Sequence, residues 1–89
     1  MRNAFYASLV HHGLRGGAVY VSEDAITYQN QTAAIEAKYK HLVLPFREIR
    51  EISCERVLLL PAVTVSLKNE ESYRFIIFNR KRFLNCLDI

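Results

Sequence analysis

The residues with the clearest chemical potential lie near the C-terminus, where three cations follow one another at Arg80-Lys81-Arg82. Asn79 precedes them and is a favourable N-cap residue, so the run is expected to open a short helix. Cations at the positive end of a helix dipole cost roughly 0.3–1 kcal/mol each. An anion held by the first helix amides and these side chains would reverse that cost. The run therefore predicts a phosphate or headgroup site, and the alternative is a solvated basic surface.

Three further cations, Arg74, Lys38 and Lys40, would extend this site if the fold brings them near the helix. The candidate anion- or lipid-binding residues are therefore Arg80, Lys81, Arg82, Arg74, Lys38 and Lys40. The formal net charge of the chain is only +3. Dedicated nucleic-acid binders carry a clearer stripe of Lys and Arg, so a nucleic-acid partner is not expected.

A second candidate is the longest apolar run, Val57 to Val63, which is far too short to span a membrane. In one interpretation, Leu58, Leu59 and Leu60 form an exposed surface for self-association or membrane contact. In the other they belong to a buried strand and turn, with Leu58 and Leu60 inside. We favour burial, although the interior of a small barrel is limited.

The sequence contains no motif typical of a catalytic site or a metal site. No serine lies in a nucleophile-elbow sequence, and the acidic residues are scattered over polar positions. His11 and His12 would point to opposite faces of a strand, and His41 has no carboxylate or thiol at ligand spacing. We expect a non-enzymatic protein that needs no metal or cofactor.

Glycine and cysteine usage also favours structural roles. Gly16-Gly17 lacks the spacing of a phosphate-binding loop, and a glycine bulge that bends a strand is the better interpretation. Cys54 and Cys86 form neither a C-x-x-C motif nor a disulfide framework. Both are predicted to be buried, reduced thiols. This favours a cytoplasmic protein, with the inner face of the membrane as a peripheral location.

The elements that must position these residues are mostly strands. A chain of 89 residues with 51% hydrophobic and 24% charged residues indicates one globular domain, residues 1–89. A period of two predicts strands over residues 18–21, 25–29, 42–46, 62–68 and 73–78. The strand over 42–46 should lie at an edge or end near Pro45, because proline lacks a ladder donor. Residues 30–40 form a long loop, or a helical turn over Thr32–Tyr39. Phe83, Leu84 and Leu87 form one apolar stripe of a C-terminal helix that must pack onto the strands.

Three segments in this order resemble the bacterial GRAM and pleckstrin-homology-like domains. Gly16–Tyr28 is similar to the hairpin pattern "GG-x-LYLT-x-x-RLIF", and Leu42–Ile49 to the strand pattern "L-x-IPL-x-x-I". Tyr73–Ile77 followed by Arg80–Phe83 is similar to "x-x-FVV…R-x-x-W". The likeness covers residues 3–88. It departs at Ser22, Thr27 and Phe83, and a glycine is missing from the last hairpin turn, where Asn69 would take the left-handed position.

The resemblance implies a mainly β fold: about seven antiparallel strands in a PH-like barrel of two roughly orthogonal sheets, capped by a short C-terminal helix. It also implies a binding or assembly module, without identifying the ligand.

Three functions follow as hypotheses. The first is a non-enzymatic PH-like interaction module that associates with another protein or with itself. The second is a peripheral membrane domain that binds anionic lipid headgroups. The third is an Sm-like RNA-binding barrel, because Val63–Asn69 resembles one strand of that fold. The Sm pattern needs a glycine near Phe75 and an N-terminal helix, and the sequence contains neither signal.

Overall fold

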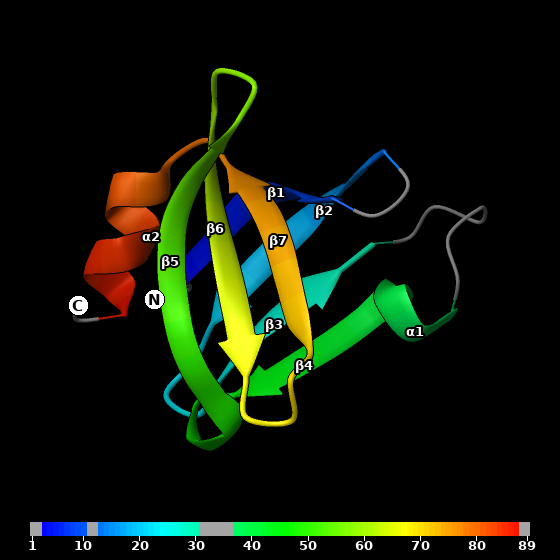
Figure 1. Ribbon diagram of the computed structural model, residues 1–89, viewed down its shortest axis with the longest axis vertical. Helices are drawn as coiled ribbons and strands as arrows, with labels where there is room; N and C mark the ends of the chain where they lie inside the picture. The colour runs from blue at the N-terminus through cyan, green and yellow to red at the C-terminus, as the bar shows by residue number, and fades with distance from the viewer. Residues whose placement is uncertain (1–2, 11–12, 31–36, 88–89) are drawn as a thin grey trace.

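The computed structural model describes residues 3–10, 13–30 and 37–87. Seven antiparallel strands form one sheet in the order β4-β3-β2-β1-β7-β6-β5 (Figure 1). The strands are β1 (Asn3–Val10), β2 (Leu14–Val21), β3 (Ala25–Gln29), β4 (His41–Pro45), β5 (Ile49–Val57), β6 (Leu60–Leu67) and β7 (Ser72–Ile77). The helical elements are α1 (Ala37–Lys40), a 3-10 turn η1 (Phe46–Glu48) and α2 (Arg80–Cys86).

The sheet curls into a half-barrel because β1 joins its two halves. β1 pairs with β2 along its whole length, but with β7 only from Ala7↔Ile77 to Leu9↔Phe75. The three strands β5 to β7 therefore cross the other four at an angle (Figure 1). Within the described part of the chain, β4 and β5 end the strand order and do not pair with each other. The expected mainly β, barrel-like fold of about seven antiparallel strands is confirmed, and its strands form one continuous sheet that curls into a half-barrel.

The alternation predicted for the later strands is confirmed. Val63, Val65 and Leu67 are buried on the inner face, and so are the alternate residues of β7, from Tyr73 to Ile77. β4 lies at a sheet edge, as Pro45 predicted. Two strands were not predicted: β1, whose Phe5, Ala7 and Leu9 are buried, and β5. In the segment 30–40, predicted to be a loop or a helical turn, residues Ala37–Lys40 form a helical turn. Residues 31–36 lie outside the described part of the structure.

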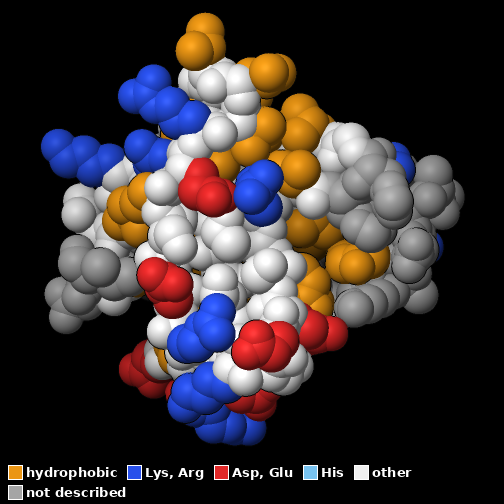
Figure 2. All heavy atoms as spheres, viewed as in Figure 1, with side chains coloured by type: hydrophobic (Ala, Val, Ile, Leu, Met, Phe, Trp, Pro, Cys, Tyr) orange, Lys and Arg blue, Asp and Glu red, His pale blue; other side chains and the backbone are white. Residues whose placement is uncertain are grey.

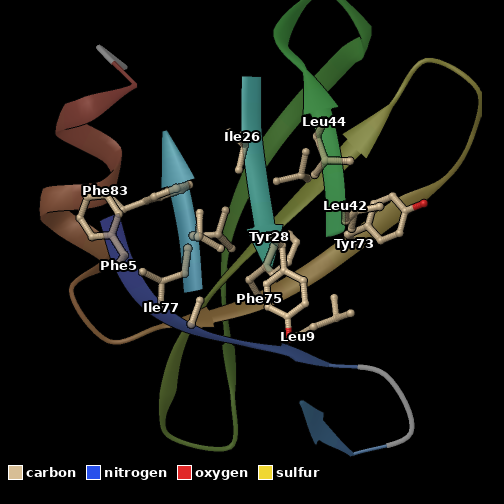
Figure 3. Close-up of a cluster of buried hydrophobic side chains, with 14 of the residues drawn as sticks. Phe5, Leu9, Ile26, Tyr28, Leu42, Leu44, Tyr73, Phe75, Ile77 and Phe83 are labelled. Carbon is tan, nitrogen blue, oxygen red and sulfur yellow. The ribbon is translucent and has the colours of Figure 1, made fainter. Parts of the chain in front are cut away.

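Helix α2 closes the core, as its apolar stripe predicted, although it is only seven residues long. Phe83 is 1% exposed and meets Phe5 edge to face, with ring centroids 5.5 Å apart (Figure 3). Leu84 and Leu87 pack against the same core. Asn79 is the N-cap residue, as predicted, but its side chain makes no capping hydrogen bond. Its carbonyl oxygen accepts a hydrogen bond from the Phe83 amide at 3.0 Å.

Three local expectations were wrong. Cys54 is exposed rather than buried, and Cys86 is partly buried. The left-handed residue in the β6–β7 turn is Glu70 (φ 76°), not Asn69. The Asn69 side chain instead accepts a hydrogen bond from the Glu71 amide at 3.0 Å, which closes a local turn around Glu70.

The third correction concerns Gly16-Gly17, where no bulge is found. The pairing of β1 with β2 runs through Ser8↔Gly16 and Ala7↔Gly17 without a shift. A Cβ on Gly17 would overlap the Gln29 carbonyl oxygen and lie 3.0 Å from Tyr28 Cε1. Glycine is therefore needed here because β3 and its buried tyrosine approach the backbone closely.

We predict that Gly17→Ala lowers the free energy of unfolding by about 1–3 kcal/mol, because the new methyl group must displace backbone or a buried ring. Gly16→Ala is the matched control, since a Cβ there meets nothing within 4 Å. Urea denaturation of both variants measures the difference. Equal midpoints for the two variants would contradict the close approach.

Candidate functional site

Two highly exposed apolar residues lie at the tip of the β5–β6 hairpin. Leu58 and Leu59 occupy the turn between the paired residues Val57 and Leu60, and their exposed fractions are 89% and 86%. The favoured prediction of burial is therefore wrong for Leu58, while Leu60 is partly buried. Figure 1 shows that this hairpin projects beyond the rest of the sheet.

The backbone at this tip is unusual as well as exposed. Leu58 has φ 58°, in the left-handed region that disfavours a side chain with a Cβ by roughly 1–2 kcal/mol. Two-residue hairpin turns with a positive φ usually place glycine at that position. A large apolar side chain that contributes nothing to the core, at a position better suited to glycine, indicates a role outside the fold.

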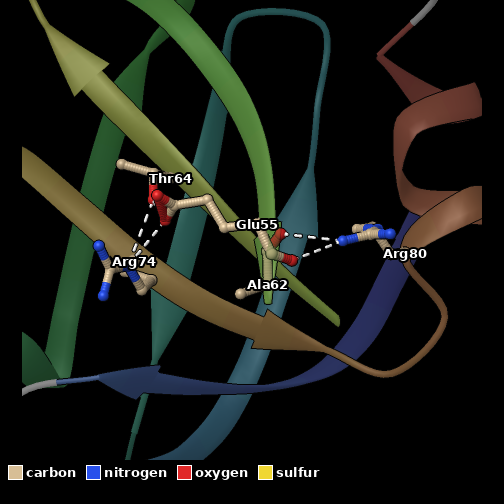
Figure 4. Close-up of polar contacts among 5 residues, drawn as sticks. All are labelled: Glu55, Ala62, Thr64, Arg74 and Arg80. Carbon is tan, nitrogen blue, oxygen red and sulfur yellow. Dashed lines mark hydrogen bonds and ion pairs between the residues drawn. The ribbon is translucent and has the colours of Figure 1, made fainter. Parts of the chain in front are cut away.

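Exposed cations occur on the hairpin and on the helix that packs beside it. Arg56 is exposed one residue before Val57, and Lys81 and Arg82 are exposed on α2. The guanidinium of Arg80 holds α2 beside the hairpin, because one of its nitrogens donates to the carbonyl oxygens of Glu55 at 2.7 Å and Ala62 at 3.3 Å (Figure 4). Arg80 is therefore a structural anchor, whereas its neighbours face solvent.

Arg74 does not join this basic group. Its Nε lies 2.8 Å from Glu55 Oε2 and 3.4 Å from Thr64 Oγ1, on the outer face of β5 to β7 (Figure 4). The pKa of Glu55 is lowered, first by the hydrogen bond from Thr64; desolvation opposes this, and the charge and hydrogen bond of Arg74 lower the pKa further. The charge of Arg74 is thus largely balanced by an ionised carboxylate.

The two lysines of the predicted site are also separated from it. Lys40 is exposed on α1, which packs against β3 and β4 on the side of the molecule away from α2 (Figure 1). The side chain of Lys38 lies outside the described part of the structure. The fold therefore divides the six predicted residues. Arg80, Lys81 and Arg82 lie together in the first turn of α2, which Arg80 holds against the β5–β6 hairpin. Arg56, which was not among the predicted residues, is exposed on β5 near the tip of this hairpin.

Acidic residues gather at the opposite end of the sheet. The β2–β3 turn and η1 are joined by the hydrogen bond from the Phe46 amide to the Asp24 carbonyl, at 2.8 Å. η1 and the β6–β7 turn are joined by the bond from the Lys68 amide to the Glu48 carbonyl, at 2.9 Å. In Figure 2, hydrophobic side chains stand at the top of the molecule with Lys and Arg to one side, and most acidic side chains lie in the lower half, interspersed with other Lys and Arg side chains. The tip end is therefore the more positive end.

Two aromatic residues on the outer face were also missed as surface features. Tyr6 on β1 is 87% exposed, and Phe78, directly after β7, is 62% exposed. Their outward position follows from the alternation of strand residues, since Phe5 and Ile77 point inward. A sequence reading that recognised β1 as a strand would have placed Tyr6 on the surface.

The described residues were also compared with what a metal site and a membrane-spanning helix require. Within residues 3–10, 13–30 and 37–87, no three His, Cys, Asp or Glu side chains gather as a metal site would require. His41 Nδ1 lies 3.2 Å from Gln29 Nε2, and His11 and His12 fall outside the described residues. None of the described helices has the length and apolar character needed to cross a bilayer.

We predict that Arg80→Ala lowers the free energy of unfolding by about 1–3 kcal/mol, because the carbonyls of Glu55 and Ala62 lose a charged donor. Lys81→Ala, the adjacent exposed position, is expected to change it by no more than about 0.5 kcal/mol. Urea midpoints distinguish the two variants. If both variants were equally stable, the proposed anchoring of α2 would be wrong.

Comparison with known proteins identifies the fold alone. No protein-family model matches the chain, and no curated protein matches its sequence. A similar solved structure is the crystal structure of the C-terminal domain of an unknown protein from Leishmania infantum. The two share a TM-score of 0.78 and 17% sequence identity over 96% of this chain and 77% of that chain. The chain therefore has a mainly β, half-barrel fold with a C-terminal helix, which another protein of distant sequence also adopts.

Proposed function

We propose that this chain is a non-enzymatic, PH-like interaction domain that docks on anionic membrane surfaces through the β5–β6 hairpin tip. The strand order supports the PH-like assignment. A four-strand meander, β1 to β4, and a three-strand meander, β5 to β7, meet where β1 pairs with β7, and a C-terminal helix closes the core. The sequence patterns around Gly16–Tyr28 and Leu42–Ile49 agree with that assignment.

The observation that carries the membrane proposal is the exposed pair Leu58 and Leu59 on a projecting turn beside Arg56, Lys81 and Arg82. Fully burying one leucine side chain contributes about 1.5–3 kcal/mol. One Lys or Arg near an anionic leaflet contributes about 1 kcal/mol. Two leucines and three cations therefore supply enough energy for reversible binding, after the cost of orienting the domain at the surface.

Charge distribution favours a membrane over a second copy of this chain. A two-fold dimer formed through the hairpin tips would bring the same cations of both copies together, and like charges in an interface are unfavourable. An anionic leaflet instead meets Lys81 and Arg82 with opposite charge. The acidic turns at the far end then point away from the membrane, so the field of the leaflet orients the domain correctly.

We predict that the protein co-sediments with vesicles of phosphatidylcholine and phosphatidylserine, and that binding weakens as salt is added. Leu58→Gly combined with Leu59→Ser should weaken binding about tenfold or more. Glycine suits the left-handed turn, so the fold should be no less stable. Lys81→Glu with Arg82→Glu should also weaken binding by more than about tenfold.

Matched controls separate this surface from general charge and hydrophobicity. Val43→Ser removes an apolar side chain that is 47% exposed on β4, and Arg47→Glu with Lys68→Glu reverses two charges at the acidic end. Both controls should bind vesicles like the parent protein. Binding that is unchanged in the tip variant, or equally strong on pure phosphatidylcholine, would disprove the proposal. A dimer in light scattering that the tip variant abolishes would favour self-association instead.

A further inference from the structure

The outer face of strands β1 to β4 differs in composition from the rest of the surface. The registers of the β1–β2, β2–β3 and β3–β4 pairs determine which residues share this face, and the structure describes all four strands. None of the outward residues is Asp, Glu, Lys or Arg, although 24% of the residues in the chain are charged. The outer face of β5 to β7, by contrast, carries the ion pair of Glu55 and Arg74. The outer surface of β1 to β4 is therefore an uncharged face.

Exposed apolar side chains are spread across the uncharged face. Tyr6 on β1 is 87% exposed, Leu14 on β2 is 54% exposed, and Val43 on β4 is 47% exposed. In the described part of the chain, the other exposed large apolar side chains are those of the hairpin tip and Phe78. The cores of protein–protein interfaces are depleted in charged residues and enriched in tyrosine. The composition of the uncharged face therefore indicates a surface that binds protein.

The polar side chains of this face can each donate and accept a hydrogen bond. They are Tyr6, Ser8, Tyr20, Thr27, Gln29 and His41. Hydroxyl, amide and neutral imidazole groups have both a donor and an acceptor, whereas a carboxylate only accepts and an ammonium or guanidinium group only donates. A two-fold interface brings the same patch of two copies together, so its polar groups meet groups of their own kind. A face with these groups and no charge is complementary to itself.

The relief of the uncharged face also suits a second sheet. A hollow of ≈ 320 Å³ is lined by Tyr6, Ala18 and Tyr20, and another of ≈ 370 Å³ is lined by Tyr20 together with Thr27 and His41. Two sheets that pack face to face lie about 10 Å apart, and side chains from both fill the space between them. The hollows on each side of Tyr20 leave room for side chains of the facing sheet.

We infer that two copies of this chain associate through their uncharged faces around a two-fold axis. Strands about 4.8 Å apart with a rise of about 3.3 Å per residue make a face of roughly 19 Å by 17–26 Å, because the four strands have five to eight residues each. An interface of this extent is at the low end of specific interfaces. The dimer is therefore reversible, with a Kd of about 10 µM to 1 mM.

The chemistry of the face does not suit other kinds of partner. Nucleic acid and anionic leaflets are bound through Lys and Arg, and the uncharged face has neither. An added strand would bind at a sheet edge, such as β4 or the part of β1 before Ala7 that is not paired with β7. The contact also differs from a dimer formed through the hairpin tips, which like charges disfavour.

The test is sedimentation equilibrium of the whole chain from about 10 µM to 1 mM, where a concentration-dependent dimer is expected. Thr27→Lys places a cation from each copy near the middle of the interface and should raise the Kd about tenfold or more. Thr27 suits this test because β3 is paired on both sides, so the change does not alter a sheet edge.

Ser66→Lys is the matched control. Ser66 is also half-buried and points outward, and it lies on β6, the middle strand of the other meander. This variant should change the Kd less than about twofold. The Leu58→Gly, Leu59→Ser variant should also leave the dimer intact, so this interface is tested separately from the membrane surface. Urea midpoints check that every variant is folded.

A charge exchange tests the two-fold arrangement. Thr27→Glu alone should weaken association like Thr27→Lys, whereas an equimolar mixture of the two variants should dimerise at least as tightly as the parent protein, because opposite charges then face each other. The inference is overturned by a monomer at every concentration, by a dimer that neither Thr27 variant weakens, by an equal loss in Ser66→Lys, or by a mixture that stays monomeric.

Discussion

The pairing of β1 with both β2 and β7 is the constraint on which the rest of the structure depends. This one strand joins the two meanders, and its partial overlap with β7 makes the sheet curl. Its inner residues Phe5, Ala7 and Leu9 lie at the junction of the core, where Phe83 of α2 meets Phe5. Its outer residue Tyr6 is exposed on the opposite face.

The basic helix has separate structural and surface parts. Arg80 uses its guanidinium to hold two strand carbonyls, which places the first turn of α2 against the hairpin that carries Leu58. Lys81 and Arg82 remain exposed beside it. A cation at a helix N-terminus is repelled by the helix dipole. For Arg80, the hydrogen bonds to the two strand carbonyls offset this repulsion. The remaining two are the cations that an anionic surface can reach.

Much of the local structure was readable from residue order. Alternation identified the buried residues of β6 and β7, Pro45 marked an edge strand, and Phe83, Leu84 and Leu87 defined the helix face. These features depend on neighbours a few positions away, which is why periodicity reveals them. The missed strand β1 carries the same alternation, interrupted by small and polar residues.

The tertiary structure decided the rest, because periodicity states which way a side chain points but not which strands pair. Long-range pairing placed Glu55 beside Arg74 and removed that arginine from the basic group, and it put Lys40 on the far side of the molecule. The edge position of β5 left Cys54 exposed, and a two-residue turn placed Leu58 in solvent instead of the core. The sequence by itself determined that Arg80, Lys81 and Arg82 begin a helix. Only the fold determined that one of them is an anchor, and that the other two lie next to an exposed apolar tip.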